Sequence, residues 1–186
     1  MANGGLFKRF KPVIIFLIII NKVVPVKLNK FFLILFRNTP TWIGKLIRYI
    51  LLKNICKKMG DNVVIFDGVI FDAPEMMEFG DSISINPRCY LAGEISIGNN
   101  VAVAHSSAFH SFNHSWKDPL KPIAKNPLYS KRITINDDVW IGCHSIVLSG
   151  VCIGSRSVIA AGSVVNRSVD KHTLVGGNPA KILKYI

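Results

Sequence analysis

The chain has 186 residues, 49% of them hydrophobic, and a formal net charge of +12 at pH 7. A chain of this length can bury a sizeable core without disulfide staples. Its cysteines, Cys56, Cys89, Cys143 and Cys152, lack the close CxxC spacing of a zinc ribbon, so we expect reduced thiols in a cytoplasmic protein. Residues 1–60 hold twelve Lys or Arg and no Asp or Glu, whereas the rest of the chain holds eleven of each sign. This asymmetry indicates two segments with different roles.

Residues 1–58 form the basic apolar segment. The apolar runs at 12–20 and 31–36 are shorter than the roughly 20 residues of a membrane-spanning helix, and no signal-peptide cleavage pattern follows the first run. Residues 42–60 have apolar residues at helical spacing with cations between them. We therefore expect helices that associate peripherally with the inner face of the cell membrane.

Three alternatives exist for this segment. It could be a helical cap over the main domain or over a partner subunit, or residues 1–36 could form a spanning hairpin. Nucleic-acid binding is disfavoured, because long aliphatic runs suit lipid better than a phosphate backbone.

From residue 59 onward the sequence repeats every six residues. A helix would show apolar spacings of three and four and a half-buried strand a spacing of two, so this period requires a short strand and a turn in each repeat. Small or β-branched residues stand four positions after most large ones, where we expect them to fit corners. Gly, Asn or Ala often follows the large residue, where we expect unusual turn dihedrals. The period predicts a solenoid of about five stacked coils. The large residues are Phe79, Ile85, Leu91, Ile97, Val103 and Phe109, then Ile135, Ile141, Val147, Ile153, Ile159 and Val165.

The repeat is interrupted once. The unit opened by Phe109 ends at His114 and the next opens at Ile135, which leaves residues 115–134 as an inserted loop rich in Pro and Lys. Long loops in compact domains are usually functional or disordered.

Two stretches, ITINDDVWIGCHSIVLSGVCIGSRSVIAAGSVVNRSV (133–169) and VGGNPAKILKYI (175–186), give the chain a resemblance to a known family. Over residues 59–186 it resembles the hexapeptide-repeat acyltransferases, most closely the maltose/galactoside O-acetyltransferase-like branch. Its basic hydrophobic N-terminal extension is similar to those of surface-polysaccharide O-acetyltransferases. The resemblance implies an all-β solenoid, a left-handed parallel β-helix preceded by helices and closed by a short C-terminal segment. It also implies a homotrimer with acetyl-CoA bound between subunits.

The resemblance assigns roles to individual residues. His114 matches the catalytic histidine, and an imidazole with a pKa near about 6.5 can deprotonate an attacking hydroxyl and return the proton to the thiolate. The backbone N–H of Cys143 occupies the place where the family stabilises the oxyanion. Asn86 matches an acceptor-binding asparagine, although Asn also suits that turn position.

The remaining matches concern acetyl-CoA. Near the adenosine 3′-phosphate the family commonly has Thr, Lys, Arg and Arg. At the matching positions this chain has Asn, Arg, Lys and Lys, so three cations are kept but their hydrogen-bonding geometry differs. The predicted coenzyme-binding residues are Trp140, Cys143, Ala161, Asn166, Arg167, Lys181 and Lys184.

A zinc site is disfavoured. His105 and His110 have the five-residue spacing of two ligands in γ-class carbonic anhydrases, but no histidine precedes His105 to supply the third. We expect both to be outward-facing coil residues, and we expect no metal.

The sequence and the resemblance thus predict an acetyl-CoA-dependent O-acetyltransferase acting on a saccharide, and the expected acceptor is a surface-polysaccharide or lipid-linked glycan intermediate. N-acetylation of an amino sugar and a non-catalytic trimeric scaffold are the alternatives. The acceptor sugar and the acyl chain length are not specified by any readable pattern.

Overall fold

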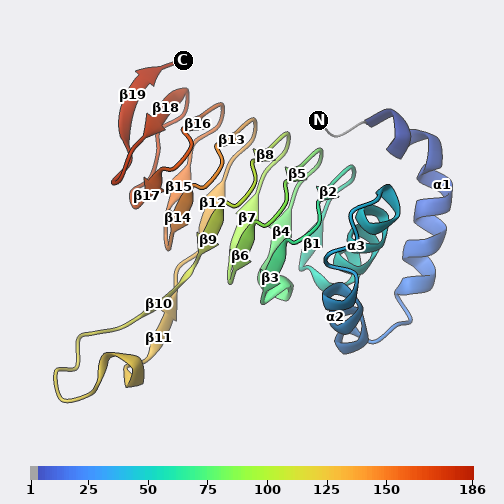
Figure 1. The fold of residues 1–186 in the computed structure, drawn as a ribbon, viewed down its shortest axis with the longest axis horizontal. Helices are drawn as coiled ribbons and strands as arrows, with labels where there is room; N and C mark the ends of the chain where they lie inside the picture. The colour runs from blue at the N-terminus through green and yellow to red at the C-terminus, as the bar shows by residue number, and fades with distance from the viewer. Residues whose placement is uncertain (1–3) are drawn as a thin grey trace.

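The computed structural model describes residues 4–186, with side chains from Phe10 onward. Three helices, α1 (Gly4–Asn21), α2 (Val26–Leu35) and α3 (Trp42–Ile55), cover one end of a parallel β-solenoid (Figure 1). The helix α3 lies directly against the first coil, and α1 and α2 contact α3. Among the described residues, none of the helices is both long and apolar enough to cross a membrane.

The solenoid has three parallel sheets, which we name A, B and C. Sheet A contains β1 (Lys58–Met59), β4 (Glu78–Phe79), β7 (Ile95–Ile97), β12 (Ile133–Ile135) and β15 (Cys152–Ile153). Sheet B contains β2 (Val64–Ile65), β5 (Ser84–Ile85), β8 (Ala102–Val103), β13 (Trp140–Ile141), β16 (Val158–Ile159) and β18 (Thr173–Gly176), and antiparallel β19 (Lys181–Tyr185) pairs with β18. Sheet C contains β3 (Ile70–Asp72), β6 (Tyr90–Ala92), β9 (Ala108–His110), β14 (Ile146–Leu148) and β17 (Val164–Val165). Short 3₁₀ helices occur at Pro74–Met76 (η1) and Ile123–Lys125 (η2).

These strands make five complete coils and part of a sixth. In the sixth, Val169 bridges to Ile153 of sheet A, and β18 continues sheet B. The turns from A to B, from B to C and from C to A form three corners that run the length of the solenoid. The predicted solenoid is confirmed, with slightly more than the expected five coils.

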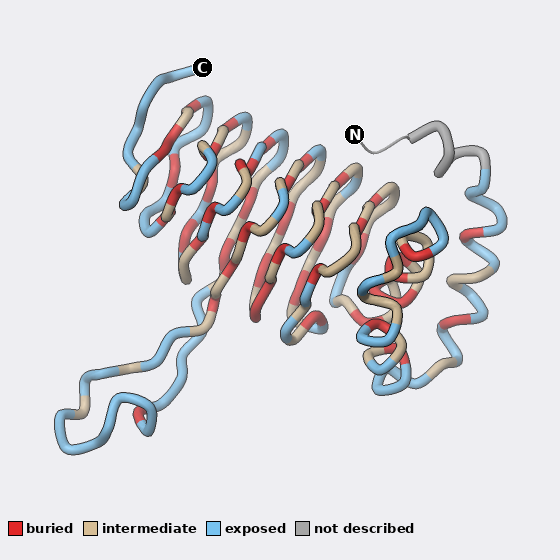
Figure 2. The backbone as a smooth tube through the Cα atoms, in the orientation of Figure 1, coloured by how far each residue is buried: buried red, intermediate tan, exposed pale blue. Residues whose placement is uncertain are grey.

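The large residues of the six-residue repeat form the core. Parallel pairing places Ile85, Val103, Ile141 and Ile159 above one another in sheet B, and none of them is more than 2% exposed. In Figure 2 the buried positions recur along every coil, and the outer helices and the projecting arm are mostly exposed. Identical stacking at each coil is the physical reason that the sequence repeats.

Small residues four positions after the large ones occupy buried corners. Ser107, Ser145 and Ser157 are fully buried, and each hydroxyl donates to a carbonyl of the next coil, at 2.9, 3.1 and 2.8 Å. These bonds satisfy the buried hydroxyls, as burial of a polar group requires.

The glycines of the repeat have a different role from the one predicted. Gly80, Gly98 and Gly142 directly follow large residues, but the positive φ angles fall two positions later, at residues such as Ser82 and Asn100. A Cβ on Gly142 would lie 2.5 Å from the backbone nitrogen of Ala161 in the next coil. These positions favour glycine because the coils approach closely there and not because of the turn dihedral.

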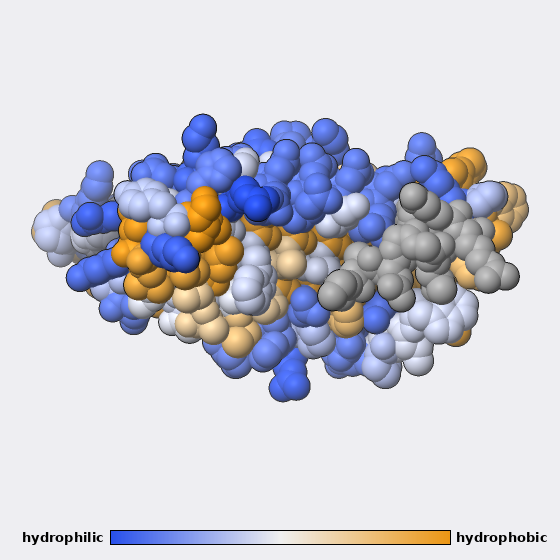
Figure 3. All heavy atoms as spheres, turned by 90° about the horizontal axis from the view of Figure 1, so that it is seen from above, coloured by the Kyte–Doolittle hydropathy of each residue, from blue (hydrophilic) through white to orange (hydrophobic). Residues whose placement is uncertain are grey.

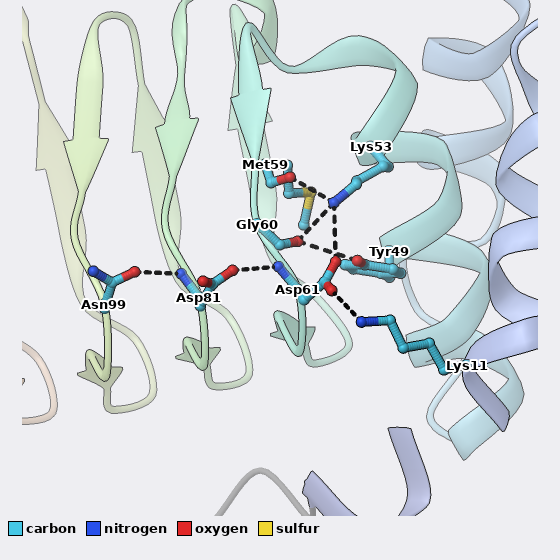
Figure 4. Close-up of polar contacts among 8 residues, drawn as sticks. All are labelled: Lys11, Tyr49, Lys53, Met59, Gly60, Asp61, Asp81 and Asn99. Atoms are coloured by element: carbon cyan, nitrogen blue, oxygen red, sulfur yellow. Dashed lines mark hydrogen bonds and ion pairs between the residues drawn. The ribbon is translucent and has the colours of Figure 1, made fainter. Parts of the chain in front are cut away.

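A ladder of Asp and Asn side chains follows the A–B corner toward the helices (Figure 4). The N–H of Asp61 donates to Asp81 at 2.6 Å, that of Asp81 to Asn99 at 2.8 Å, and that of Asn99 to Asp137 at 2.6 Å. Asp61 ends the ladder and accepts from Lys11 of α1 at 3.0 Å and from Lys53 of α3 at 3.4 Å. This corner therefore ties the helices to the solenoid.

Candidate active site

An arm projects from the C–A corner of the third coil (Figure 1). It is an antiparallel pair, β10 (Phe112–His114) and β11 (Leu128–Ser130), in which His114 pairs with Leu128. The side chain of His114 is exposed. The repeat count ended the coil at His114, but the structure begins the arm at Phe112 and so places His114 on the arm.

Ser111 explains why the chain leaves the coil there. It is fully buried, and its hydroxyl accepts the N–H of Glu94 at 2.8 Å and lies 3.1 Å from the Ser130 hydroxyl. Both strands of the arm are thus anchored at one point. Near the tip, the buried Asn126 side chain donates to the carbonyls of Asp118, Lys121 and Pro122.

The B–C corner carries the predicted oxyanion donor. Cys143 lies between β13 and β14, and its carbonyl accepts the N–H of Gly162 at 2.8 Å. In the part of the chain that the structure describes, the N–H of Cys143 has no acceptor. Ala161 is exposed at the equivalent place one coil further on. A backbone donor without a protein partner is available to a ligand.

Asn86 lies at the same corner in an earlier coil. Its side-chain amide donates one N–H to the carbonyl of Val103 at 2.8 Å, so its oxygen and its second N–H remain available to an acceptor sugar. Both a structural and a binding role were expected for Asn86 from the sequence, and this hydrogen bond is the structural one.

His105 and His144 form a contact that the sequence analysis did not single out. Their rings meet edge to face at 5.3 Å, and the N–H of His144 donates to the carbonyl of His105 at 3.1 Å. The repeat does not predict this contact, because His105 follows Val103 by two residues whereas His144 follows Ile141, the partner of Val103, by three. His110 instead packs on Tyr90, with ring centroids 5.3 Å apart. Among the described residues, no three His, Cys, Asp or Glu side chains are grouped to hold a metal ion.

Trp140 stands on the outer face of sheet B and is 56% exposed. It lines an open hollow of about 360 Å³ together with Asp138, Arg156 and the C-terminal Ile186. Arg156 and Asp138 pair at 2.9 Å at the rim. The hollow offers an aromatic surface for a flat ligand group beside a charged pair.

The predicted phosphate-binding residues lie in two places. Asn166 and Arg167 follow β17 at the C–A corner, whereas Lys181 and Lys184 lie on β19, at the end of sheet B. All four are exposed.

The predicted site residues therefore fall on two sides of one chain. His114, Asn166 and Arg167 lie at the C–A corner. Cys143 and Ala161 lie at the B–C corner, on the opposite edge of sheet C, and Trp140 lies on sheet B. Sheet C separates the two groups by about six residues, or on the order of 15–20 Å. One chain alone does not bring His114 to the Cys143 N–H.

A solenoid built from six-residue repeats, three to a coil, and interrupted by one arm with an exposed histidine is typical of the hexapeptide-repeat transferases. Comparison with known proteins agrees: the sequence pattern of the family described as bacterial transferase hexapeptide (six repeats) matches residues 132–167. The chain is similar to a Vibrio cholerae hexapeptide-repeat acetyltransferase solved in complex with acetyl-CoA, with 35% identity and a TM-score of 0.68 over 74% of this chain and 75% of that one. The chain belongs to the hexapeptide-repeat acetyltransferase family.

Two relatives extend this similarity. The solved maltose O-acetyltransferase of Clostridium difficile shares 26% identity at a TM-score of 0.78, covering 89% of this chain and 88% of that one. The Escherichia coli galactoside O-acetyltransferase is 28% identical over 138 residues, which cover 73% of this chain and 67% of the relative.

Proposed function

We propose that the protein transfers the acetyl group of acetyl-CoA to a hydroxyl of a saccharide, with His114 as the general base. The observation that carries the proposal is the exposed His114 on an arm that leaves the coils, in a family whose relatives bind acetyl-CoA and are named for acetylating sugars. A neutral imidazole accepts the proton of the sugar hydroxyl as its oxygen attacks the thioester carbon, and then gives that proton to the departing coenzyme A thiolate.

The N–H of Cys143 is the proposed oxyanion donor. The attack places negative charge on the former thioester oxygen, and a fixed donor without another acceptor stabilises that charge by a few kcal/mol. Asn86 presents its free oxygen near the same corner for the acceptor.

The proposed active site lies between subunits of a homotrimer. Because His114 and Cys143 border opposite edges of sheet C, a neighbouring chain has to supply one of them. Acetyl-CoA would then lie in the cleft between two solenoids, against Trp140 and the backbone at Ala161. The phosphates of acetyl-CoA would contact Asn166 and the three exposed cations Arg167, Lys181 and Lys184.

The proposed acceptor is a surface-polysaccharide or lipid-linked glycan intermediate at the inner face of the cell membrane. The support is the basic apolar segment 1–58, which carries all of the chain's excess positive charge at one end of the solenoid. Such a segment favours peripheral contact with anionic lipid.

The direct test is release of coenzyme A from acetyl-CoA in the presence of mono-, oligo- and lipid-linked saccharides. We expect turnover with at least one hydroxyl acceptor, and a loss of about 10²–10⁴-fold in His114→Ala. His172→Asn is the matched control, because His172 is exposed at the far end of the solenoid and its positive φ suits Asn. Equal turnover by His114→Ala and the wild type would remove His114 from this role.

A further inference from the structure

The outer face of the two N-terminal helices is apolar. Helix α1 buries Ile14 but exposes Phe16 (61%) and Ile19 (58%), and α2 exposes Phe31 (58%) and Ile34 (65%). In Figure 3 hydrophobic surface is visible at the helical end of the molecule. A water-soluble monomer rarely leaves large apolar side chains gathered in this way without a partner. The other exposed apolar residues of this face are Val13, Ile15, Ile20, Val23, Val26, Leu28 and Leu35.

The charges around this face identify the kind of partner. Residues 1–60 contain twelve cations and no acid. Lys11 and Lys30 pair with Asp61 and Glu75. Lys22 and Lys27 are exposed and have no ion pair within the described residues. A second copy would bring the same positive charge to the contact, whereas anionic lipid headgroups complement it.

The position of the face fixes how the molecule would stand on a membrane. The helices cover the end of the solenoid at which the first coil begins, and α1 lies outside α3 (Figure 1). A bilayer in contact with α1 and α2 would therefore face the end of the solenoid, with the coils rising away from it.

The height of the arm follows from this orientation. Two helix layers of about 10 Å each, α3 and then α1, separate the outer side of α1 from the first coil. The arm leaves the third coil, two spacings or about 10 Å further on. His114 would thus stand about 30 Å above the lipid surface.

We propose that the outer face of α1 and α2 binds an anionic bilayer and holds the solenoid upright. Combined with the proposed function, on which this second part rests, the geometry selects the acceptor class. The reacting hydroxyl belongs to a sugar several residues along a membrane-held glycan, and a sugar directly attached to its lipid cannot reach His114.

Binding is tested by flotation of the full chain with phosphatidylcholine vesicles, with and without phosphatidylglycerol. We expect flotation with the anionic vesicles and at least about a tenfold loss of binding in the double variant Phe16→Ser/Ile34→Ser, whose side chains would otherwise be buried in lipid. Leu120→Ser is the matched control, because Leu120 is 92% exposed on the arm, and it should bind like the wild type. Unchanged flotation of the double variant would overturn the proposal. The proposal would also be overturned if the double substitution changed only the sedimentation of the lipid-free protein, because a second copy of the chain would then cover the face.

Orientation is tested by energy transfer from single dyes to labelled headgroups. Lys58 and Cys152 lie in one row of outward residues on sheet A, four strand spacings apart. A dye on Lys58→Cys should therefore lie about 19 Å nearer the membrane than a dye on Cys152. Equal transfer from the two dyes contradicts an upright solenoid. Neither measurement requires acetyl-CoA, so the surface can fail while the acetyltransferase proposal stands, and the reverse.

The glycan prediction is tested on the same vesicles. Long lipid-linked chains should be acetylated at least about tenfold faster than a lipid-linked monosaccharide, because only the long chains span the distance to His114. Equal rates would overturn the assigned acceptor class.

Discussion

Arg48 joins the helical cap to the first coil. Its side chain is fully buried and donates to four backbone carbonyls, those of Phe36, Arg37 and Thr39 after α2 and that of Ile65 in β2. Burial lowers the pKa of this guanidinium and the charge of Asp67 opposes that shift. A cation among the carbonyls that follow a helix C-terminus is also favoured by the helix dipole.

We predict that Arg48→Met lowers the free energy of unfolding by about 3 kcal/mol, because buried carbonyls lose their donors. The measurement is chemical denaturation. Lys22→Met, an exposed lysine on the same cap, should change the free energy by less than about 0.5 kcal/mol. A similar small effect for Arg48→Met would show that water or other donors replace the guanidinium.

At the scale of the coil, close stacking sets the choice of residue. Among the residues that the structure describes, ten non-glycine residues have a positive φ, and they show that Asn, Ser, Arg and His all serve the turn position. Glycine is favoured instead where the next coil's backbone leaves no room for a Cβ, as at Gly142.

We predict that Gly142→Ala destabilises the protein by about 2 kcal/mol through this overlap. Gly162→Asn is the control: its φ is +70°, a Cβ there would meet nothing within 4 Å, and other coils place Asn62 and Asn100 at such turns. Thermal unfolding of both variants makes the comparison. Equal stability of Gly142→Ala and the wild type would mean that the coils separate easily.

At the scale of the whole molecule, the A–B corner ladder couples the helices to the solenoid. The hydrogen bond from Lys11 is the main cause that lowers the pKa of Asp61, and the charge of Lys53 adds to it. Because the folded pKa lies below the unfolded value of about 3.9, this stabilisation is complete above that pH and is lost as the pH falls through the folded pKa.

We predict that the protection of α1 amides from hydrogen exchange, corrected for intrinsic rates, falls as the pH drops below about 4. The Asp61 side chain is 47% exposed, so the effect should be under about 1 kcal/mol. Asp61→Asn should lose most of this pH dependence. Asp118→Asn, which breaks an ion pair on the arm, should retain it. An unchanged pH profile in Asp61→Asn would place the coupling elsewhere.

The features of the fold that recur in every coil could be predicted from the sequence, whereas the features that occur only once could not. Stacked residues such as Val103 and Ile141 meet the same environment in every coil, so their period reveals the solenoid and its core. The start of the arm depends on the hydrogen bonds of Ser111, and the ring contact of His105 with His144 depends on which coils become neighbours across the insertion. Neither leaves a period in the chain. The separation of His114 from Cys143 likewise required the corners to be placed in space.

The proposed active site is shared between chains. Cys143→Pro removes the proposed oxyanion donor at a corner that accepts proline, since Pro87 occupies the equivalent position of an earlier coil. We expect this variant to lose about 10²–10³-fold in turnover.

The most direct measurement is acetyl-CoA turnover by mixed oligomers of co-expressed His114→Ala and Cys143→Pro chains. If each site takes His114 from one chain and Cys143 from the next, random assembly restores about a quarter of wild-type activity, because one neighbouring pair in four is intact on both sides. If each site lies within one chain, every site carries a defect, and the mixture stays as inactive as either variant alone.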